Sequence, residues 1–414
     1  MSVVKPFRAV RPAAEYADRV ASLPYDVMSS EEAYDFVKDK PYTFMRIDRA
    51  EVNFPKGTDQ YSEQVYLKAR EILDSLEDKG IFAQDEKPMF YIYRQVMNGR
   101  VQTGLVGCTS IDEYIENKIK KHELTRADKE TDRINHVNYC DANTGPIFLV
   151  YRPKEALRKV ISDWAASHTP VYDFVTPDGI GSTVWAVDEE ETVNRISELF
   201  KEVEALYIAD GHHRANSAVK VGLMRRQDNP GYDGTEEFNY FLAVLFSSDE
   251  LEIMPYNRVA NTPRNTPREE LLRRISEKFE ITEIGREPYA PESRHSFGML
   301  LGNVWYRLTA KEGTFDPDNV IDSLDVSILQ KNLIAPVLGI DDPRMSKKID
   351  FVGGIRGLGE LVKRANTDME IAFSMYPTSL DELMNIADAG EIMPPKSTWF
   401  EPKLLSGLFI HKLK

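Results

Sequence analysis

Residues 206–218 read LYIADGHHRANSA, and this stretch indicates the fold class and the place of a ligand site. Its first residues are apolar, with the tyrosine and isoleucine typical of a β-strand, and the apolar run stops at Asp210-Gly211. Small residues compatible with a helix resume at Ala215. Open α/β sheets commonly bind ligands where a strand leads into a helix. The stretch therefore predicts an α/β protein with a ligand site at this turn.

Several side chains in the turn suit proton or phosphate chemistry. His212 and His213 can titrate near neutral pH, and Arg214 offers a forked donor for phosphate or carboxylate. Gly211 allows a tight turn and close approach of a ligand to the backbone, and the free N–H groups of a helix start favour an anion. The alternative is an ordinary polar turn with two solvated histidines.

Composition sets limits on the class of protein. The chain has 414 residues, enough for two or three domains, and no apolar run approaches the roughly 20 residues that span a bilayer. The first residues lack the apolar core of a secretory signal, and two cysteines, Cys108 and Cys140, form neither a disulfide framework nor a metal-ligand pattern. We therefore expect a cytoplasmic protein. Its net charge of -15 opposes binding to nucleic acid or anionic membrane but leaves a small anionic substrate open.

Along the chain, apolar runs alternate with charged helical stretches, which is typical of a mixed α/β or α+β protein. The expected elements are a hairpin over 89–96 and 101–108 turning at Asn98-Gly99, an amphipathic helix over 62–79, strands over 146–151 and 241–246, and a helix over 268–278. We expect a division near residue 260. Residues 1–260 would form the catalytic region, and the α/β region 261–414 would contribute the loop 393–403 to the site.

A second polar block covers residues 120–136. On a helix, cationic and imidazole side chains of this block would fall at spacings of three or four and share one face; they are His122, Arg126, Lys129, Arg133 and His136. Several phosphate oxygens need such a cluster of cations. The alternative is a solvated helix with i,i+4 ion pairs. Four of the seven histidines lie in this block and the Asp210 turn, which favours function.

Three further segments carry polar groups in turns. Asn143-Thr144-Gly145-Pro146 precedes a strand, and residues 23–29 place Asp26 in a proline-initiated turn before a helix capped by Ser29 or Ser30. The rigid loop 393–403 offers an ammonium and two hydroxyls, those of Lys396, Ser397 and Thr398. The alternatives are that Asp26 is only a turn residue and that the loop only packs aromatic side chains.

The absence of several known motifs argues against some classes of enzyme. The sequence has no P-loop, no Gly-x-Gly-x-x-Gly dinucleotide fingerprint, no protein-kinase signature set and no Gly-x-Ser-x-Gly elbow. The glycine-rich residues 351–357 fit a strand-end turn better than a phosphate loop. His122-Glu123 lacks the second histidine of a His-Glu-x-x-His helix, which argues against a zinc protease.

The strand followed by DGHHR at 210–214 resembles the signature of the ParB/sulfiredoxin-like fold. A wider set of motifs resembles a long bacterial and archaeal family of domains of unknown function described as SerK-like. The motifs are LPYDV at 23–27, KKHE at 120–123, NTGP at 143–146, YIADGHHR at 207–214 and MPPKSTWFEPK at 393–403. The resemblance implies a ParB/sulfiredoxin-like core with additional α/β domains. It also implies phosphorylation of free L-serine to O-phosphoserine, feeding cysteine or serine metabolism.

Phosphoryl transfer requires a positioned hydroxyl, a base and positive charge around the moving phosphate. Under the resemblance, Asp26 or Glu123 accepts the serine proton, and Asp210 helps to hold Mg²⁺ together with donor phosphate oxygens. The expected catalytic residues are Asp26, Glu123, Asp210 and His212. The expected substrate- and phosphate-binding residues are Tyr25, His122, Arg126, Lys129, Arg133, His136, Asn143, Thr144, His213, Arg214, Lys396, Ser397 and Thr398.

The donor is expected to be pyrophosphate, ADP or ATP. Dispersed cations and the missing nucleotide loop fit pyrophosphate at least as well as a nucleotide.

Two other functions stay open. A ParB-like nucleotide or nucleic-acid switch is opposed by the charge of -15 and by the lack of a helix-turn-helix candidate. A regulatory protein that senses an amino acid would bind its ligand without turnover. We expect small-molecule partners, with no nucleic acid and no membrane, and a homodimer is an open alternative.

Overall fold

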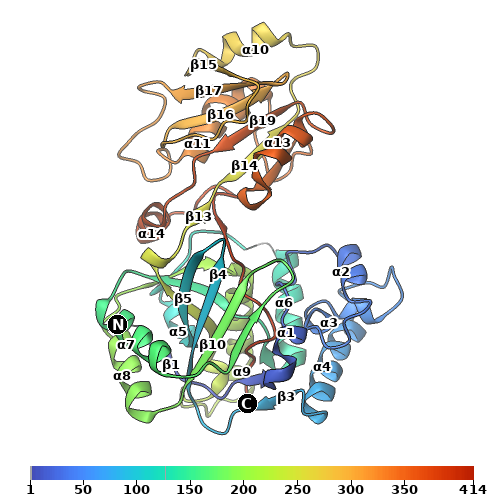
Figure 1. Cartoon of the computed structure of the whole chain (residues 1–414), viewed down its shortest axis with the longest axis vertical. Helices are drawn as coiled ribbons and strands as arrows, with labels where there is room; N and C mark the ends of the chain where they lie inside the picture. The colour runs from blue at the N-terminus through green and yellow to red at the C-terminus, as the bar shows by residue number, and fades with distance from the viewer. Residues whose placement is uncertain (1, 126) are drawn as a thin grey trace. The chain divides into compact units, whose positions relative to one another are not determined.

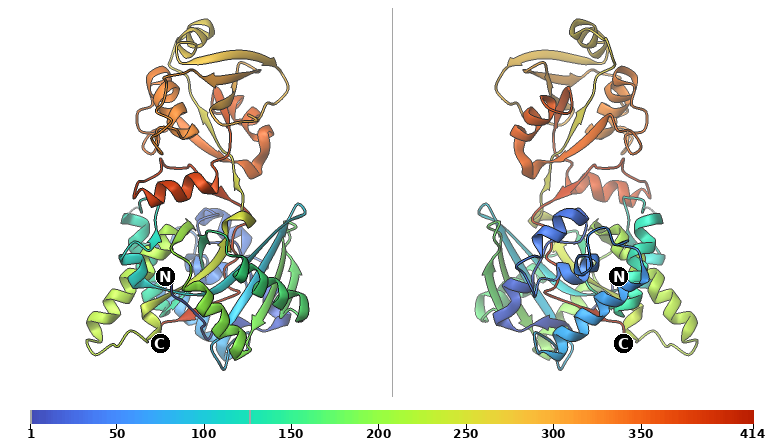
Figure 2. Two further views of the ribbon diagram at one scale, coloured as in Figure 1. Left: turned by 90° about the vertical axis from the view of Figure 1, so that its left-hand side faces the viewer. Right: turned by 90° about the vertical axis from the view of Figure 1, so that its right-hand side faces the viewer.

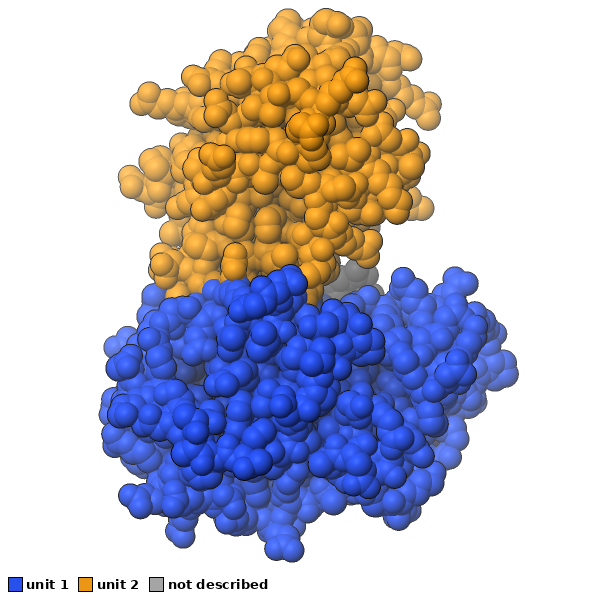
Figure 3. Space-filling view, in the orientation of Figure 1, with its two compact units in different colours: residues 1–251, 402–414 blue, residues 252–401 orange. Residues whose placement is uncertain are grey.

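The computed structural model describes residues 2–125 and 127–414. The chain forms two compact units: unit 1 comprises residues 1–251 and 402–414, and unit 2 comprises residues 252–401 (Figure 3). The expected boundary near residue 260 coincides with the end of strand β14 (Tyr256–Ala260), inside unit 2. The predicted mixed α/β class is confirmed, because unit 1 is built on a mixed sheet and unit 2 on an antiparallel one.

Among its described residues, unit 1 contains a nine-stranded sheet in the order β6-β11-β8-β12-β5-β4-β10-β9, with β1 also paired to β5 (Figure 1). The β6–β11 and β8–β12 pairs are parallel and the others antiparallel. The strands are β1 (Val4–Lys5), β4 (Phe90–Met97), β5 (Arg100–Ser110), β6 (Ile119–Lys120), β8 (Ile147–Tyr151), β9 (Tyr172–Val175), β10 (Gly181–Val187), β11 (Leu206–Asp210) and β12 (Tyr240–Ser247).

The predicted hairpin is confirmed as β4 and β5. Asn98 and Gly99 both have positive φ angles, 53° and 80°, as a tight primed turn requires. The predicted strands at 146–151, 206–210 and 241–246 are β8, β11 and β12. The apolar run of β12 is buried almost throughout, since the strand lies in the middle of the sheet.

Four helices share a hydrophobic core with the large sheet. They are α5 (Ile111–Ile115), α7 (Glu155–Ser167), α8 (Glu190–Phe200) and α9 (His212–Asp228). On β12, Phe241, Ala243 and Leu245 face this core with the period of two that a strand imposes. Buried apolar side chains of α7 and α8 belong to the same core. The core holds the end of β11 and the start of α9 in a fixed place.

A second layer of unit 1 is helical. α4 (Glu63–Asp78) confirms the predicted helix over 62–79; it is followed by Gly80, whose φ is +68°. α6 (Ala127–Cys140) packs against both α4 and α9 (Figure 2). The predicted cap Ser29 forms a capping box with Glu32 at the start of α2 (Ser30–Phe36). The other elements of this unit are α1 (Ala17–Val20), α3 (Met45–Asp48), β2 (Val10–Pro12), β3 (Phe82–Gln84), β7 (Ala142–Asn143) and β21 (His411–Lys412).

Unit 2 is built on a six-stranded antiparallel sheet in the order β15-β17-β16-β19-β14-β18. Trp305 and Leu361 belong to its core, which joins the sheet to α13. The predicted helix over 268–278 is α10 and ends at Ile275. The glycine-rich residues 351–357 run from the end of β18 through a short 3-10 turn at Gly354–Arg356 to the start of α13. The elements besides β14 are β13 (Ile253–Met254), α10 (Arg268–Ile275), β15 (Phe279–Gly285), β16 (Ser296–Leu301), β17 (Val304–Ala310), α11 (Asp325–Leu329), α12 (Ala335–Leu338), β18 (Ile349–Gly353), α13 (Gly357–Ala365), β19 (Ile371–Met375), α14 (Leu380–Asp388) and β20 (Trp399–Phe400). Among the described residues, no helix is long and apolar enough to cross a membrane.

Candidate functional site

The DGHHR turn joins β11 directly to α9. Asp210 is the last residue of the strand, and Gly211 takes a left-handed conformation with φ +93°. The helix begins at His212 rather than at Ala215, so His213 and Arg214 also lie in its first turn. The glycine makes this early start possible, because a side chain would disfavour the sharp change of direction. The first N–H groups of α9 have no partners within the helix, which suits an anion.

Asp210 lies between two cations. Its Oδ2 is 3.4 Å from Arg214 Nη2 and 3.9 Å from Lys403 Nζ. Burial alone would raise the pKa of Asp210, but Lys403, Arg214 and His212 outweigh it and hold the pKa below its ordinary value. The carboxylate is therefore ionised at neutral pH. The cationic role of Lys403 escaped the sequence analysis, although it is the last residue of the predicted loop 393–403.

His122 and His212 meet beside this turn. Their rings are perpendicular with centroids 4.5 Å apart, and Glu123 Oε2 lies 3.9 Å from His212 Nδ1. Burial lowers the pKa of His122 to about 4 and that of His212 well below its usual range. Both imidazoles are therefore neutral near pH 7. The parallel pairing of β6 with β11 brings His122 here, because it follows β6 as Asp210 ends β11.

The predicted single cationic helix face is wrong at its start. His122 precedes α6, which begins at Ala127, and Arg126 lies outside the described residues. After β6 the chain stays beside β11, where His122 is hydrogen-bonded to the backbone of Ile208, so His122 lies outside the helix. Lys129, Arg133 and His136 do line one cavity together, as their spacing of four and three residues predicts.

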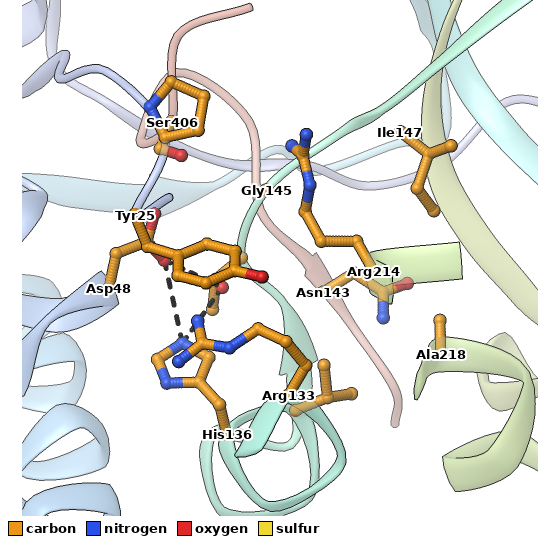
Figure 4. Close-up of a pocket in the computed structure, with 13 residues that line it drawn as sticks. Tyr25, Asp48, Arg133, His136, Asn143, Gly145, Ile147, Arg214, Ala218 and Ser406 are labelled. Carbon is orange, nitrogen blue, oxygen red and sulfur yellow. Dashed lines mark hydrogen bonds and ion pairs between the residues drawn. The ribbon is translucent and has the colours of Figure 1, made fainter. Parts of the chain in front are cut away.

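A cavity lies between α6, α9 and the 143–145 turn (Figure 4). It is lined by Pro24, Tyr25, Asp48, Arg133, His136, Val137, Asn143, Thr144, Gly145, Ile147, Arg214, Ala218 and Ser406. Six of these residues are among those expected from the sequence: Tyr25, Arg133, His136, Asn143, Thr144 and Arg214. Segments far apart in the sequence therefore meet at one polar cavity of unit 1.

Asp48 is the buried carboxylate of this cavity. Thr144 Oγ1 donates to Asp48 Oδ1 over 3.3 Å and lies 3.1 Å from His136 Nε2, which is itself 3.7 Å from Asp48 Oδ1. Burial raises the pKa of Asp48 in spite of the nearby Arg133 and a hydrogen bond from Ser406. Burial and Arg133 lower the pKa of His136. A carboxylate with a raised pKa beside a neutral imidazole is suited to accept a proton.

Two arginines give the cavity its positive charge. The Arg133 guanidinium lies over the Tyr25 ring, 4.0 Å from its centroid (Figure 4). Asp132 holds the same guanidinium through an ion pair of 2.9 Å. Arg214 Nη1 donates to the Pro146 carbonyl over 2.6 Å, whereas its Nε is buried without a hydrogen-bond partner among the described residues. Since buried N–H groups are normally paired, this donor is suited to an anionic ligand.

A second cavity shares Tyr25, Asp48, Arg133 and His136 with the first. It is also lined by Arg49, Ala50, Glu51, Gln60, Val65, Tyr66, Lys129 and Asp132. Arg49 donates to the carbonyls of Tyr25 and Met28, over 2.7 and 2.6 Å, and so orders the turn over 23–29. The two cavities therefore adjoin each other at residues that include the Asp48–His136 pair.

Other expected site residues lie elsewhere or serve the fold. Asp26 is exposed and lines neither cavity. The side-chain oxygen of Asn143 accepts from the Leu242 N–H over 3.2 Å and lies 3.2 Å from His411 Nδ1, which ties β7 to its neighbours. His213 is half-buried in the first turn of α9.

The predicted loop residues Lys396, Ser397 and Thr398 belong to unit 2. There the Ser397 hydroxyl donates to the Pro394 carbonyl over 2.6 Å, and the Lys396 carbonyl accepts from Arg258 over 3.0 Å. The Trp399 ring packs edge-on against Tyr256, with ring centroids 5.0 Å apart. Within unit 2 the loop is therefore anchored by an aromatic contact and by its own hydrogen bonds.

Asp48, Arg49 and Ser406 also line the two cavities, although no sequence pattern predicts a role for them. Residues 47–51 read IDRAE, a charged set between apolar residues, but no motif marks it as functional. Ser406 stands in an apolar C-terminal segment and reaches the site through its pairing with Ser22. Only the tertiary arrangement shows that Asp48 and Ser406 line one cavity with Arg133 and Arg214, and that Arg49 lines the second cavity with Arg133.

Comparisons with known proteins place these features in context. The family model described as "Protein of unknown function (DUF1015)" matches residues 4–327. No curated protein matches the chain by sequence. Among solved structures, a mutant free serine kinase in complex with ADP is similar at 15% identity and a TM-score of 0.37, covering 75% of this chain and 93% of that chain.

Two other solved structures show a similar degree of likeness. A conserved hypothetical protein from Pyrococcus furiosus has 15% identity and a TM-score of 0.37, covering 73% of this chain and 93% of its own. SbnI with a C-terminal truncation, from Staphylococcus aureus, has 10% identity and a TM-score of 0.36, covering 73% of this chain and 85% of its own.

Proposed function

This chain belongs to the DUF1015 family, whose description assigns no activity, and from its site we propose a small-molecule kinase that converts free L-serine to O-phospho-L-serine. One observation carries the proposal. Arg214 lines the buried polar cavity and also contacts Asp210 in the strand-to-helix turn. A place for a small polar acceptor therefore adjoins a place for phosphate, which is what phosphoryl transfer needs.

The cavity between α6 and α9 is suited to a free amino acid. Arg133, fixed between Asp132 and the Tyr25 ring, offers a planar donor set for the serine carboxylate. Thr144 and Ser406 offer hydroxyls on the wall of the same cavity. The apolar lining from Val137, Ile147 and Ala218 can contact the methylene group of the serine side chain.

We assign the proton acceptor to Asp48. It is buried in the cavity, whereas Asp26 is exposed and Glu123 lies beside His212, outside both cavities. In the proposed step, the serine Oγ–H bond breaks and its proton passes to Asp48 while Oγ bonds to the terminal phosphorus of the donor. The bond from that phosphorus to its bridging oxygen breaks, releasing phosphate from pyrophosphate, AMP from ADP or ADP from ATP.

The donor phosphates are assigned to the Asp210 turn. The first N–H groups of α9, His213 and Arg214 supply donors there, with Lys129 nearer the second cavity. Asp210 is an ionised carboxylate at the end of a strand, which suits Mg²⁺. Because one carboxylate supplies few ligands, the ion would also be held by phosphate oxygens of the donor. When bound, Mg²⁺ would neutralise charge on the transferring phosphate. The phosphate role predicted from the sequence for Lys396, Ser397 and Thr398 stays a prediction, since these residues belong to unit 2.

The test is direct. Purified protein is incubated with L-serine and Mg²⁺, and separately with pyrophosphate, ADP or ATP, and O-phosphoserine is measured by mass spectrometry. We expect product with at least one donor and its loss in Asp210→Asn. Asp163→Asn, an exposed carboxylate on α7 paired with Lys159, is the matched control. Absence of product with every donor overturns the kinase, and serine binding without turnover would then favour the sensing alternative.

A further inference from the structure

His122 and His212 carry buried ring nitrogens that the proposed phosphoryl transfer does not explain. The two residues are 2% and 6% exposed. His122 Nδ1 and His212 Nε2 are both buried without a hydrogen-bond partner among the described residues. Buried polar atoms are normally paired, so two such nitrogens on contacting rings indicate a missing partner.

The geometry of these groups is that of a ligand set. The rings are perpendicular with centroids 4.5 Å apart, and Glu123 follows His122 directly. One donor atom from each of the three residues lies within 4.8 Å of the others. Two ligand atoms bound about 2.0–2.2 Å from one metal lie about 3–4 Å apart, so small side-chain rotations would complete the set.

A hydrogen bond to the backbone orients the His122 ring. The ring is hydrogen-bonded to the backbone of Ile208, and since its Nδ1 has no partner among the described residues, this bond uses the other nitrogen. Histidines that bind metals usually donate their second N–H to a carbonyl or carboxylate, which orients the ring and frees the other lone pair. The β6–β11 pairing holds the two histidines together independently of any ligand.

We infer that His122, Glu123 and His212 bind a divalent first-row transition-metal ion of the Zn²⁺ or Co²⁺ type. Imidazole nitrogens suit these ions, whereas Mg²⁺ takes oxygen ligands, so this site is chemically distinct from the one assigned to Asp210. Three protein ligands leave at least one coordination position open for water or a substrate oxygen. The inference goes beyond the proposed kinase and does not depend on it.

The test uses the full chain freed of metal by dialysis against a chelator. It is titrated with CoCl₂, followed by visible absorption, and with ZnCl₂, followed by calorimetry, without serine or phosphate donor. We expect one ion per chain, a Co²⁺ ligand-field spectrum with nitrogen ligands, and no displacement by a large excess of MgCl₂. Glu123→Gln and His212→Gln should each weaken binding at least about tenfold. His168→Gln removes an exposed histidine elsewhere and should leave the affinity unchanged.

Several results would overturn the inference. They are the absence of a saturable Co²⁺ spectrum, equal affinity in Glu123→Gln and the unsubstituted protein, or an equal loss in His168→Gln. Glu123 is exposed, so its substitution should leave the fold intact even if His212→Gln does not. Because metal binding is read without substrates, failure to form phosphoserine leaves this site supported. Phosphoserine formed by a protein that binds no Co²⁺ rejects the site and keeps the kinase.

Discussion

Arg214 Nη2 lies 3.4 Å from Asp210 Oδ2, across the first turn of α9. The same guanidinium donates to the Pro146 carbonyl and lines the buried cavity, and its Nε has no hydrogen-bond partner among the described residues. One side chain thus connects the end of β11 with the space that holds Asp48. A ligand at either end would therefore lie close to the same guanidinium.

Arg214→Gln should weaken binding of the anionic donor. Losing a charge-assisted hydrogen bond of the usual strength corresponds to a rise in KM for the donor of about 10- to 150-fold. Arg214→Lys keeps the charge but cannot reach both Asp210 and Pro146, so its KM should lie between those of Arg214→Gln and the unsubstituted enzyme. Steady-state kinetics with the active donor measure both. Equal KM values in all three proteins would contradict the proposed role.

Asp48→Asn should lower kcat by about 10²- to 10⁴-fold with little change in KM for serine, since it removes the proposed base. Because burial raises the pKa of Asp48, the active ionised form is lost as the pH falls through that raised value. The pH profile of kcat/KM should therefore show an acid limb above the ordinary range of an aspartate. Asp163→Asn is the control for surface charge. A profile whose acid limb survives in Asp48→Asn would assign the base elsewhere.

Gly211→Ala should impair both stability and activity. Its φ of +93° is unfavourable for alanine by about 1–2 kcal/mol, and an added Cβ would lie 3.1 Å from Arg214 Nη2. We therefore expect a lower melting temperature and a higher donor KM. Gly80→Ala is a matched control, because its φ of +68° is also left-handed but no described atom lies within 4 Å of the added Cβ. It should be destabilised without a change in KM; equal kinetic effects in both would contradict the contact with Arg214.

Asp325→Asn should stabilise unit 2 at pH 8 but not at pH 4. Burial raises the pKa of Asp325 to about 7 from 3.8, its Oδ1 accepts from the His295 N–H over 2.8 Å, and its Oδ2 has no partner among the described residues. The folded state holds a proton that the unfolded state releases between these pH values. Stability is therefore full below pH 3.8 and falls as the pH rises to 7, by at most about 4 kcal/mol.

Asparagine can keep the bond from His295 and carries no charge, so the pH-dependent loss should disappear. Urea unfolding at the two pH values, with hydrogen exchange of unit 2 peptides, measures the effect. An unchanged pH dependence in the variant would show that Asp325 is ionised in the folded protein at neutral pH.

Much of the local structure could be predicted from the sequence. Asn98-Gly99 predicts the hairpin because both residues tolerate positive φ, and the spacing of apolar residues over 62–79 predicts α4. The predicted start of α9 is three residues late, since histidine has a modest helix propensity and only the left-handed Gly211 shows that the helix can begin at once. The supposed helical face from His122 fails for a similar reason, because the β6–β11 pairing keeps that residue beside the sheet.

The candidate site also combines residues that the sequence predicts with residues that only the tertiary structure brings together. The sequence by itself determined the reactive groups that lie within one turn, Asp210 to Arg214, because strand, glycine and helix start are local properties. Only the tertiary structure decided that Asp48 and Ser406 face Arg133, and that His122 contacts His212. No periodicity links residues so far apart. They are brought together by strand pairing and by burial of a shared apolar core, which depend on the whole fold.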